Sequence, residues 1–407
     1  MKCAAQFLLP VLLPVLLPAA LVACTDTRAP ITGTQSLRIE LTAPTQTGDV
    51  NQRLPDTAHA VTVNLQALDE RGNPDPSFTA DVRAYAQFLG TLTPDLPEVP
   101  LATIHVEGGV ATNQMLTLPN TVLGPTTLWF DDGLGVGRDY EPGTVTGTSP
   151  TLWFRDPFVV DLQRPRDETG IDALTSTPLQ NKQISVHTSR YGARGRLVVT
   201  SVFSQGYTVD DAQCADEAGT PPCISQAYDH ALIFTFSAAR DQVGHLLELG
   251  QVIDRFTGGL SEFNGLTEVG FPRTYGPEVA DVNPARVPPP VPFDLAWFGP
   301  LSMPTGMINF ERNEAGAISV AGAVVCPIGP EYMTYKQWKI DPSGMGGAVC
   351  NGNKVLSIIT AGTDFTTDPA TLVGRKITRL VGILRPVSIG SFNVWILFPR
   401  GATDLTL

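Results

Sequence analysis

The sequence lacks every common catalytic signature. It contains no Gly-x-Ser-x-Gly nucleophile elbow, no His-Glu-x-x-His zinc motif and no Walker phosphate loop. Its few histidines stand far apart in the chain: His59, His105, His187, His230 and His245. We therefore predict no catalytic residue, no metal ligand set and no cofactor from the sequence. An enzyme whose site is assembled from distant residues remains the alternative.

Basic side chains are also scarce. The chain has 27 Lys and Arg against 40 Asp and Glu, which gives a net charge of −13. This acidity opposes binding to nucleic acid or to an anionic surface, so nucleic acid is an unlikely partner. Residues 291–407 are the exception, because they carry nine basic and eight acidic side chains. If the protein binds a polymer, that last region is the predicted contact.

Only one long hydrophobic run is present, and it ends at a cysteine. Residues 4–23 contain no charged side chain, but Pro10, Pro14 and Pro18 would break a permanent membrane helix. Lys2 and the apolar run after it are typical of a signal peptide, here residues 1–23. The alternatives are an uncleaved membrane span and a plain secreted protein.

The end of this run, Leu21-Val22-Ala23-Cys24, resembles the lipobox of bacterial lipoproteins. The resemblance implies cleavage before Cys24, acylation of that cysteine and attachment to the membrane by lipid. In many lipoproteins an aspartate after the cysteine retains the protein at the inner membrane, whereas Thr25 stands here. The resemblance therefore implies a location at the cell outer membrane.

Cysteine is rare in the rest of the chain. Beyond Cys3 and Cys24 it contains only Cys214, Cys223, Cys326 and Cys350. Four cysteines allow three pairings, and an exported protein permits disulfides. Structural zinc sites favour cysteines two to four residues apart, which this spacing does not provide. We predict the local pairing, Cys214 with Cys223 and Cys326 with Cys350.

The first part of the chain reads as a spacer of β-strands. After a tether over residues 24–35, alternation predicts a strand with Val61, Val63, Leu65 and Ala67 on its buried face. This strand, the turn Asp69-x-x-Gly72-Asn73-Pro74 and the segment from Gly109 to Leu116 resemble bacterial immunoglobulin-like domains. The resemblance implies an Ig-like β-sandwich over residues 36–160, followed by a linker over 161–181.

The second half contains an internal repeat. Residues 250–273 and 374–400 share glycine at their first and ninth positions, and both end in Phe-Pro-Arg. Upstream, GRLVVTSV at 195 aligns with GAISVAGAV at 316, which places each cysteine pair in the same loop of its copy. The strand order resembles OB-like domains of secreted bacterial proteins, and a different small sandwich is the alternative. The predicted fold is thus mainly β, with OB-like repeats over 182–290 and 291–407.

Two classes of function compete. The first is a non-catalytic, lipid-anchored envelope protein that binds a protein or polysaccharide partner through its β-modules. Its predicted ligand contacts are Lys336, Trp338 and Lys339, because aromatic rings beside cations stack bases or sugars. The second is an envelope hydrolase or its accessory subunit, with a site built from the acidic segment 210–217 and a histidine.

Overall fold

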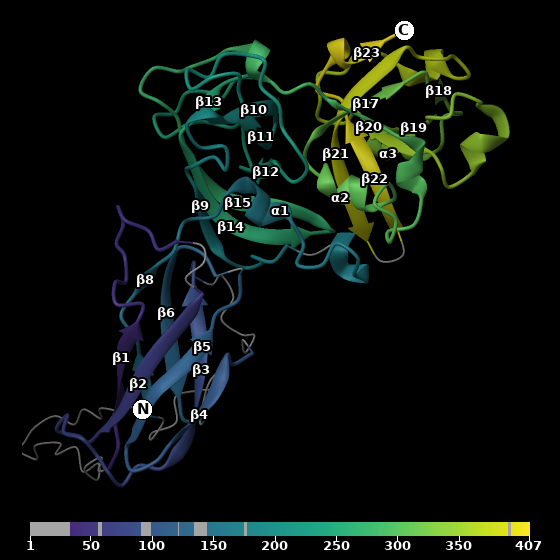
Figure 1. The fold of residues 1–407 in the computed structure, drawn as a ribbon. Helices are drawn as coiled ribbons and strands as arrows, with labels where there is room; N and C mark the ends of the chain where they lie inside the picture. Colours follow the sequence, from purple (N-terminus) through teal and green to yellow (C-terminus); the bar gives the residue numbers. More distant parts are fainter. Residues whose placement is uncertain are drawn as a thin grey trace, which may run out of the picture.

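The chain folds into three β-rich bodies. The computed structural model describes residues 33–55, 59–90, 99–120, 122–133, 145–174, 177–389 and 392–407. These residues form three separate sheets, and the fold is mainly β as predicted. We call the bodies the N-terminal domain (33–158), the first module (159–290) and the second module (291–407). The two modules lie side by side, and the N-terminal domain extends away from the first module (Figure 1).

In the N-terminal domain, the regular elements of the described residues are all strands. They are β1 (Ser36–Ala43), β2 (Ala60–Leu68), β3 (Ala80–Phe88), β4 (Ala102–Val106), β5 (Val110–Thr117), β6 (Pro125–Asp131), β7 (Thr146–Thr148) and β8 (Leu152–Trp153). Their order is β4-β3-β6-β7-β1-β2-β5, and β8 pairs with β6. Strand β7 is antiparallel to β6 and parallel to β1, so it joins the two halves of the domain.

The predicted alternation in β2 is confirmed. Val61, Val63, Leu65 and Ala67 are at most 1% exposed, whereas the residues between them are partly exposed. These side chains pack in one core with those of β3 and β6, such as Val82 and Phe130. Burial on one face of each strand therefore fixes the register of the domain.

The first module contains short helices before its strands. Its elements are α1 (Val159–Gln163), η1 (Ile171–Leu174), β9 (Gln183–Val186), η2 (Gly192–Arg194), β10 (Gly195–Phe203), β11 (Gly206–Gln213), β12 (His230–Phe234), β13 (Val252–Ile253), β14 (Arg255–Phe263), β15 (Leu266–Tyr275) and η3 (Pro284–Arg286). The strand order is β13-β10-β11-β12-β15-β14-β9, with β12 and β15 parallel. The predicted linker 161–181 belongs to this body, because Leu162 and Leu179 are fully buried in its core.

The second module has a nearly closed sheet. Its elements are β16 (Val291–Pro292), η4 (Leu295–Phe298), α2 (Ile308–Arg312), β17 (Ala317–Ala321), β18 (Val324–Val325), α3 (Glu331–Tyr335), β19 (Gln337–Asp341), η5 (Gly347–Asn351), β20 (Leu356–Ile359), η6 (Pro369–Leu372), β21 (Arg379–Ile389), β22 (Phe392–Phe398), η7 (Ala402–Asp404) and β23 (Leu405–Thr406). The order is β16-β17-β21-β22-β20-β19-β18, and β23 pairs with β21. The chain bends at Gly322, where φ is 67°, between β17 and β18. Strand β17 lies next to one end of the strand order and β18 lies at the other end, so the sheet almost closes.

Strand register shows that the two modules are structural repeats. Gly258 of β14 lies opposite Ile184 of β9, and Gly382 of β21 lies opposite Ile318 of β17. The first strands are therefore QISV at 183 and AISV at 317, with both isoleucines buried. The sequence alignment of GRLVVTSV, which forms β10, with GAISVAGAV, which begins with β17, was wrong by one strand. Strand β10 pairs with β11 as β18 pairs with β19, so β10 corresponds to β18.

The same register aligns the largest core side chains of the modules. Tyr207 lies opposite Ile233, and Trp338 lies opposite Ile358 in the equivalent strand pair. Tyr207 is fully buried and Trp338 is 1% exposed. The Tyr207 hydroxyl lies 2.7 Å from Oγ1 of Thr274, which satisfies the polar atom in the core. Both residues are therefore core anchors at one position of the repeat.

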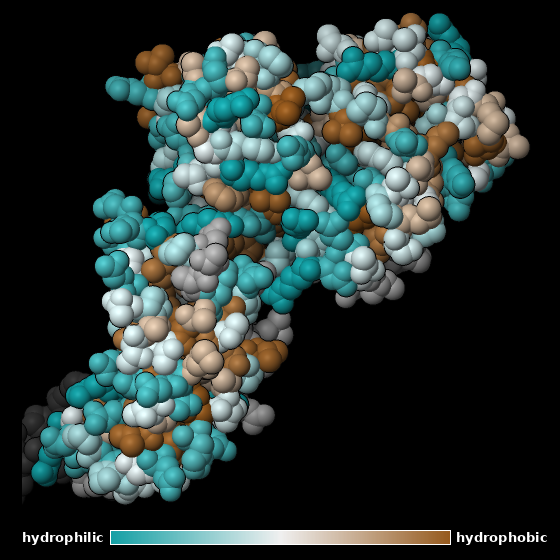
Figure 2. All heavy atoms as spheres, viewed as in Figure 1, coloured by the Kyte–Doolittle hydropathy of each residue, from teal (hydrophilic) through white to brown (hydrophobic). Residues whose placement is uncertain are grey.

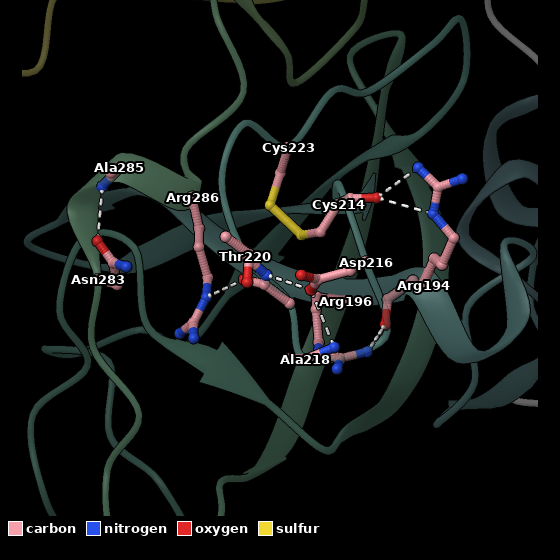
Figure 3. Close-up of a disulfide and its surroundings, with 12 residues drawn as sticks. Arg194, Arg196, Cys214, Asp216, Ala218, Thr220, Cys223, Asn283, Ala285 and Arg286 are labelled. Carbon is pink, nitrogen blue, oxygen red and sulfur yellow. Dashed lines mark hydrogen bonds between the residues drawn. A yellow bond between two sulfur atoms is a disulfide. The ribbon is translucent and has the colours of Figure 1, made fainter.

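Both predicted disulfides are present, but their positions are not equivalent. Cys214 and Cys223 close the loop between β11 and β12, whereas Cys326 follows β18 and Cys350 lies between β19 and β20. The expectation that both pairs occupy the same loop was thus wrong. Figure 3 shows the first disulfide, where Nη2 of Arg194 donates to the Cys214 carbonyl at 2.8 Å.

Candidate functional site

The predicted contacts Lys336, Trp338 and Lys339 do not form a binding surface. Trp338 is 1% exposed, so its ring has no face free for a ligand. Lys336 ends α3 in a left-handed conformation, and its Nζ lies 4.9 Å from the Tyr332 ring centroid. Helix α3 ends directly before β19, so Lys336 caps the helix whereas Trp338 and Lys339 belong to the strand. The prediction for Trp338 was wrong because the strand face that carries it is the core face.

The predicted lipidation site, Cys24, and the signal peptide lie outside the described residues. Among the residues that the structure describes, no helix combines the length and apolar character needed to cross a membrane. Attachment by lipid at Cys24 therefore stays a prediction.

The acidic segment 210–217 is buried at its start and exposed at its end. Asp210 and Asp211 belong to β11 and are buried, at 3% and 0% exposure. Oδ1 of Asp210 lies 2.9 Å from Nδ1 of His230, which is itself 2% exposed. Burial is the largest single influence and opposes the charged imidazole, but the carboxylates of Asp210 and Asp229 together outweigh it and raise the pKa of His230. The pair therefore favours a protonated histidine held by a buried carboxylate.

This Asp–His pair has no room for a substrate. A Cβ built on Gly316 of the second module would lie only 2.7 Å from the His230 ring, so the glycine backbone covers it. Asp216, at the far end of the segment, accepts hydrogen bonds from the backbone amides of Ala218 and Thr220. In the described chain, no group of three or more His, Cys, Asp or Glu is arranged to hold a metal ion. The segment is thus structural.

The junction between the modules buries an apolar face of the second module. On β17, β21 and β22 this face consists of Ala317, Val381, Ile383 and Phe398. The guanidinium of Arg385 lies between the rings of Phe203 and Phe398, 4.3 and 4.5 Å from their centroids. A cleft of about 510 Å³ remains here between the modules. These contacts hold the two modules together.

A second cleft of about 560 Å³ lies between the N-terminal domain and the first module. We call it the interdomain cleft. Its lining residues come from both bodies: Val50, Arg53, Pro125, Trp153, Asp156, Ser185, His187, Asp254, Arg255 and Tyr275. On the side of the molecule drawn in Figure 2, hydrophobic residues form small groups separated by hydrophilic ones. The cleft brings two large aromatic rings, Trp153 and Tyr275, together with charged groups.

The N-terminal domain supplies Trp153 and Arg53 to the cleft. Arg53 follows a tight turn that begins at Gly48 and lies against Trp153. A Cβ on Gly48 would meet the Gln52 carbonyl at 2.6 Å, so glycine is needed there. Arg53 lies over the Trp153 ring at 5.3 Å, and its Nη2 donates to Asp156 at 2.8 Å. Its other terminal nitrogen, Nη1, is buried without a hydrogen-bond partner among the described residues. Arg53 thus holds the Trp153 ring and Asp156 together on this side of the cleft.

The first module supplies Arg255 and Tyr275. These two residues lie directly opposite each other on β14 and β15, and the Arg255 guanidinium is 4.0 Å from the Tyr275 ring centroid. His187 follows β9 and lies 3.7 Å from Asp156. Phe256 and Thr274, their neighbours in sequence, point into the core. Every second residue of these strands thus points into the core, and the residues between them face the cleft.

The same alternation extends beyond the cleft. Arg273 lies opposite Thr257, and Thr257 lies opposite Ser185. The strands β9, β14 and β15 therefore present one outer face, which we define by its residues: Ser185, Arg255, Thr257, Arg273 and Tyr275. Neither Arg255 nor Arg273 has a hydrogen bond or ion pair with another described side chain. Both guanidinium groups are available to an external acceptor.

This arrangement suits non-covalent recognition. Trp153 and Tyr275 offer flat apolar rings, while arginine, aspartate, serine and histidine side chains offer directional hydrogen bonds. No protein-family model and no curated protein sequence matches the chain. The interpretation of the cleft therefore depends on its own geometry.

Sequence reasoning did not find this site, although a signal was present. In the stretch Phe-Pro-Arg-Thr-Tyr at 271–275, large or basic residues occupy every second position. It was used only to mark the end of a repeat. Its partners, Trp153 and Arg53, are more than a hundred residues away in the sequence, so only the fold brings them together.

Proposed function

We propose that this protein is a non-catalytic, lipid-anchored protein of the bacterial outer membrane that binds an envelope polysaccharide in the interdomain cleft. The N-terminal domain acts as an Ig-like spacer above the lipid on Cys24, and the two modules are OB-like. The observation that carries the binding function is the cleft itself, where Trp153 and Tyr275 stand among polar side chains.

The strand orders support the domain assignments. In both modules the first strand is split, and its halves pair with the second and fourth strands. The third strand is parallel to the fifth, as an OB-like topology requires. In the N-terminal domain, the parallel pairing of the first strand with β7 bridges two antiparallel sets in the manner of an Ig-like sandwich.

The lining of the cleft supports a polysaccharide in preference to a small apolar ligand. Sugar rings present apolar CH faces and equatorial hydroxyl groups, which match aromatic rings beside aspartate, arginine and serine. The aromatic side chains lie on two different bodies, so a bound polymer would bridge the N-terminal domain and the first module. Such bridging increases affinity without a deep pocket.

The test is titration calorimetry of the full chain with a panel of envelope polysaccharides. We expect Trp153→Ala and Tyr275→Ala each to weaken binding about tenfold, because each removes one aromatic contact surface. Phe263→Ala is the matched control, since this ring is 61% exposed at the far end of β14. Equal binding by all variants would remove the cleft as the site.

Two further measurements address the anchor and the absence of catalysis. Replacing Cys24 with alanine should move the protein from the detergent phase to the aqueous phase, because the lipid is lost. Incubation of the full chain with ester, phosphodiester and glycoside substrates should give no turnover. Turnover of any of them would favour the hydrolase alternative.

A further inference from the structure

We infer that the polysaccharide bound in the cleft is anionic and that its contact continues along the outer face of β9, β14 and β15 to an exposed phenylalanine pair. This inference rests on the proposed function and names the chemical class of its ligand. The inference depends on Arg255 and Arg273, which have no ion-pair partner among the described residues and lie on the face that leads out of the cleft.

The charges along this path favour an acidic ligand. Asp156 is already paired with Arg53 at 2.8 Å. Among the described residues of the cleft and the outer face, Asp254 is then the one remaining negative charge. Arg255 and Arg273 contribute two positive charges without ion-pair partners. The whole chain has a net charge of −13, so this local excess of positive charge runs against the general balance. Carboxylate or phosphate groups are the acceptors that guanidinium forks fit best.

The path ends at Phe236 and Phe271, which stand in solvent. Phe271 is 84% exposed and Phe236 is 56% exposed, with their ring centroids 5.2 Å apart. Both have a left-handed backbone, with φ of 49° and 58°. This conformation is costly for a bulky side chain and persists where the surroundings impose it. Neither phenylalanine ring packs into a hydrophobic core that would offset this conformational cost.

A β-bulge turns Phe271 outward. The β14–β15 register shifts between Thr257 and Gly259, opposite Phe271 and Pro272. A Cβ on Gly258 would meet Val269 at 2.5 Å and the Gly270 carbonyl at 2.7 Å, so only glycine allows the strands to pack at this bulge. Bulges commonly redirect a side chain toward a functional surface. Here the bulge supplies a hydrophobic contact next to Arg273.

A polymer chain fits this path better than a bilayer or a nucleic acid. The cleft is lined by residues of two bodies and contains Asp156 and Asp254, which an anionic bilayer would meet unfavourably. Nucleic acid requires a strongly positive surface, whereas the whole chain is acidic. A flexible acidic glycan can enter the cleft with some residues and place its charged groups over Arg255 and Arg273.

The experiment compares one polymer in two charge states. The full chain is titrated with a polyuronate and with the same polymer after chemical reduction of its carboxyl groups. We expect the acidic form to bind at least tenfold more tightly at low salt, and this preference to shrink at high salt. A phosphate-substituted polysaccharide, measured in parallel, distinguishes carboxylate from phosphate as the recognised group.

Variants locate the contact. Arg255→Gln and Arg273→Gln should each weaken binding of the acidic form by about tenfold and weaken binding of the reduced form by less. Phe271→Ala should weaken binding of long polymers more than that of short fragments that fill only the cleft. Arg71→Gln is the control, because this arginine is 80% exposed on a distant turn of the N-terminal domain.

The outcomes separate the two proposals. Equal affinity for the acidic and reduced forms, with unchanged Arg variants, overturns the charge inference and leaves polysaccharide binding in place. Binding of neither form, together with no binding in the wider panel, overturns both proposals. Binding to anionic lipid vesicles that depends on Phe271, without polymer binding, assigns the exposed pair to a membrane and also overturns the inference.

Discussion

The two modules use the same face of the same fold in opposite ways. In the second module, the outer face of β17, β21 and β22 carries Val381 and Ile383, at 4% and 1% exposure, and is buried at the junction. In the first module, the equivalent face carries Thr257 opposite Arg273 and stays in solvent. Thr257 and Val381 occupy equivalent positions, because each directly precedes the repeat glycine, Gly258 or Gly382, of its module. A few substitutions therefore decide whether this face joins modules or remains open.

The repeated Phe-Pro-Arg sequence shows the same contrast. Phe398 of the second module packs at the junction, and Arg400 is tied to Asp404 at 2.6 Å. Phe271 and Arg273 of the first module have neither kind of partner. A motif that seals an interface in one copy is thus left free in the other, which is why we assign the open copy to ligand binding.

The largest expected effect tests the shared core position. Trp338→Ala should lower the free energy of unfolding by about 3–5 kcal/mol, because it leaves a large cavity where the first module has Tyr207. Urea denaturation measures this. Polysaccharide binding at temperatures where the variant is folded should be unchanged, and loss of binding there would restore Trp338 as a ligand contact.

The second prediction contrasts the two faces directly. Val381→Asp should destabilise the chain by about 2–3 kcal/mol, because the carboxylate loses its hydration at the junction unless the modules separate. Thr257→Asp, the equivalent change in the first module, should alter stability by less than about 0.5 kcal/mol because its face is open. Thermal denaturation of both variants gives the comparison, and equal effects would contradict the distinction between the faces.

The third prediction concerns pH and the same junction. Glu262 accepts hydrogen bonds from the Thr177 amide and the Thr267 hydroxyl, and Glu314 accepts one from the Thr267 amide. Burial raises the pKa of Glu262 to about 7. Burial, followed by the charge of neighbouring carboxyl groups, also raises the pKa of Glu311 and Glu314 well above the usual range. The folded chain therefore binds these protons more tightly than the unfolded chain.

The contribution of these carboxyl groups to the free energy of unfolding should therefore be fully present below about pH 4.5. It should be lost as the pH rises through about 7. The expected loss between pH 5 and pH 8 is on the order of 2 kcal/mol. Unfolding midpoints in urea at the two pH values measure it. Glu314→Gln should reduce the loss, whereas Glu217→Gln, on the exposed disulfide loop, should not.

The smallest predicted effect compares the disulfides. Replacing Cys326 and Cys350 with alanine should cost about 3.5 kcal/mol, and replacing Cys214 and Cys223 about 2.7 kcal/mol, because the loops closed span 24 and 9 residues. The difference between the two variants, about 0.8 kcal/mol, is the quantity to measure by denaturation. A reversed order would show that native contacts of the first loop outweigh chain entropy.

The sequence predicted the strands better than the site. Alternation in β2 identified Val61 and Val63 as core because a half-buried strand has a period of two. Trp338, predicted as a ligand contact, also lies on a strand, but its side chain points into the core. Aromatic and basic residues in one stretch do not reveal which strand face is buried, because that depends on the neighbouring strands.

By itself the sequence determined the mainly β architecture, the repeat and the local pairing of its cysteines, since periodicity, glycine positions and short cysteine separations act along the chain. Only the tertiary structure decided which copy of the repeat keeps its outer face open. It also decided that Trp153 and Arg53 of the N-terminal domain meet Tyr275 and Arg255 of the first module. Such contacts depend on how separately folded bodies pack, and packing is set by surface shape and charge that no local pattern encodes.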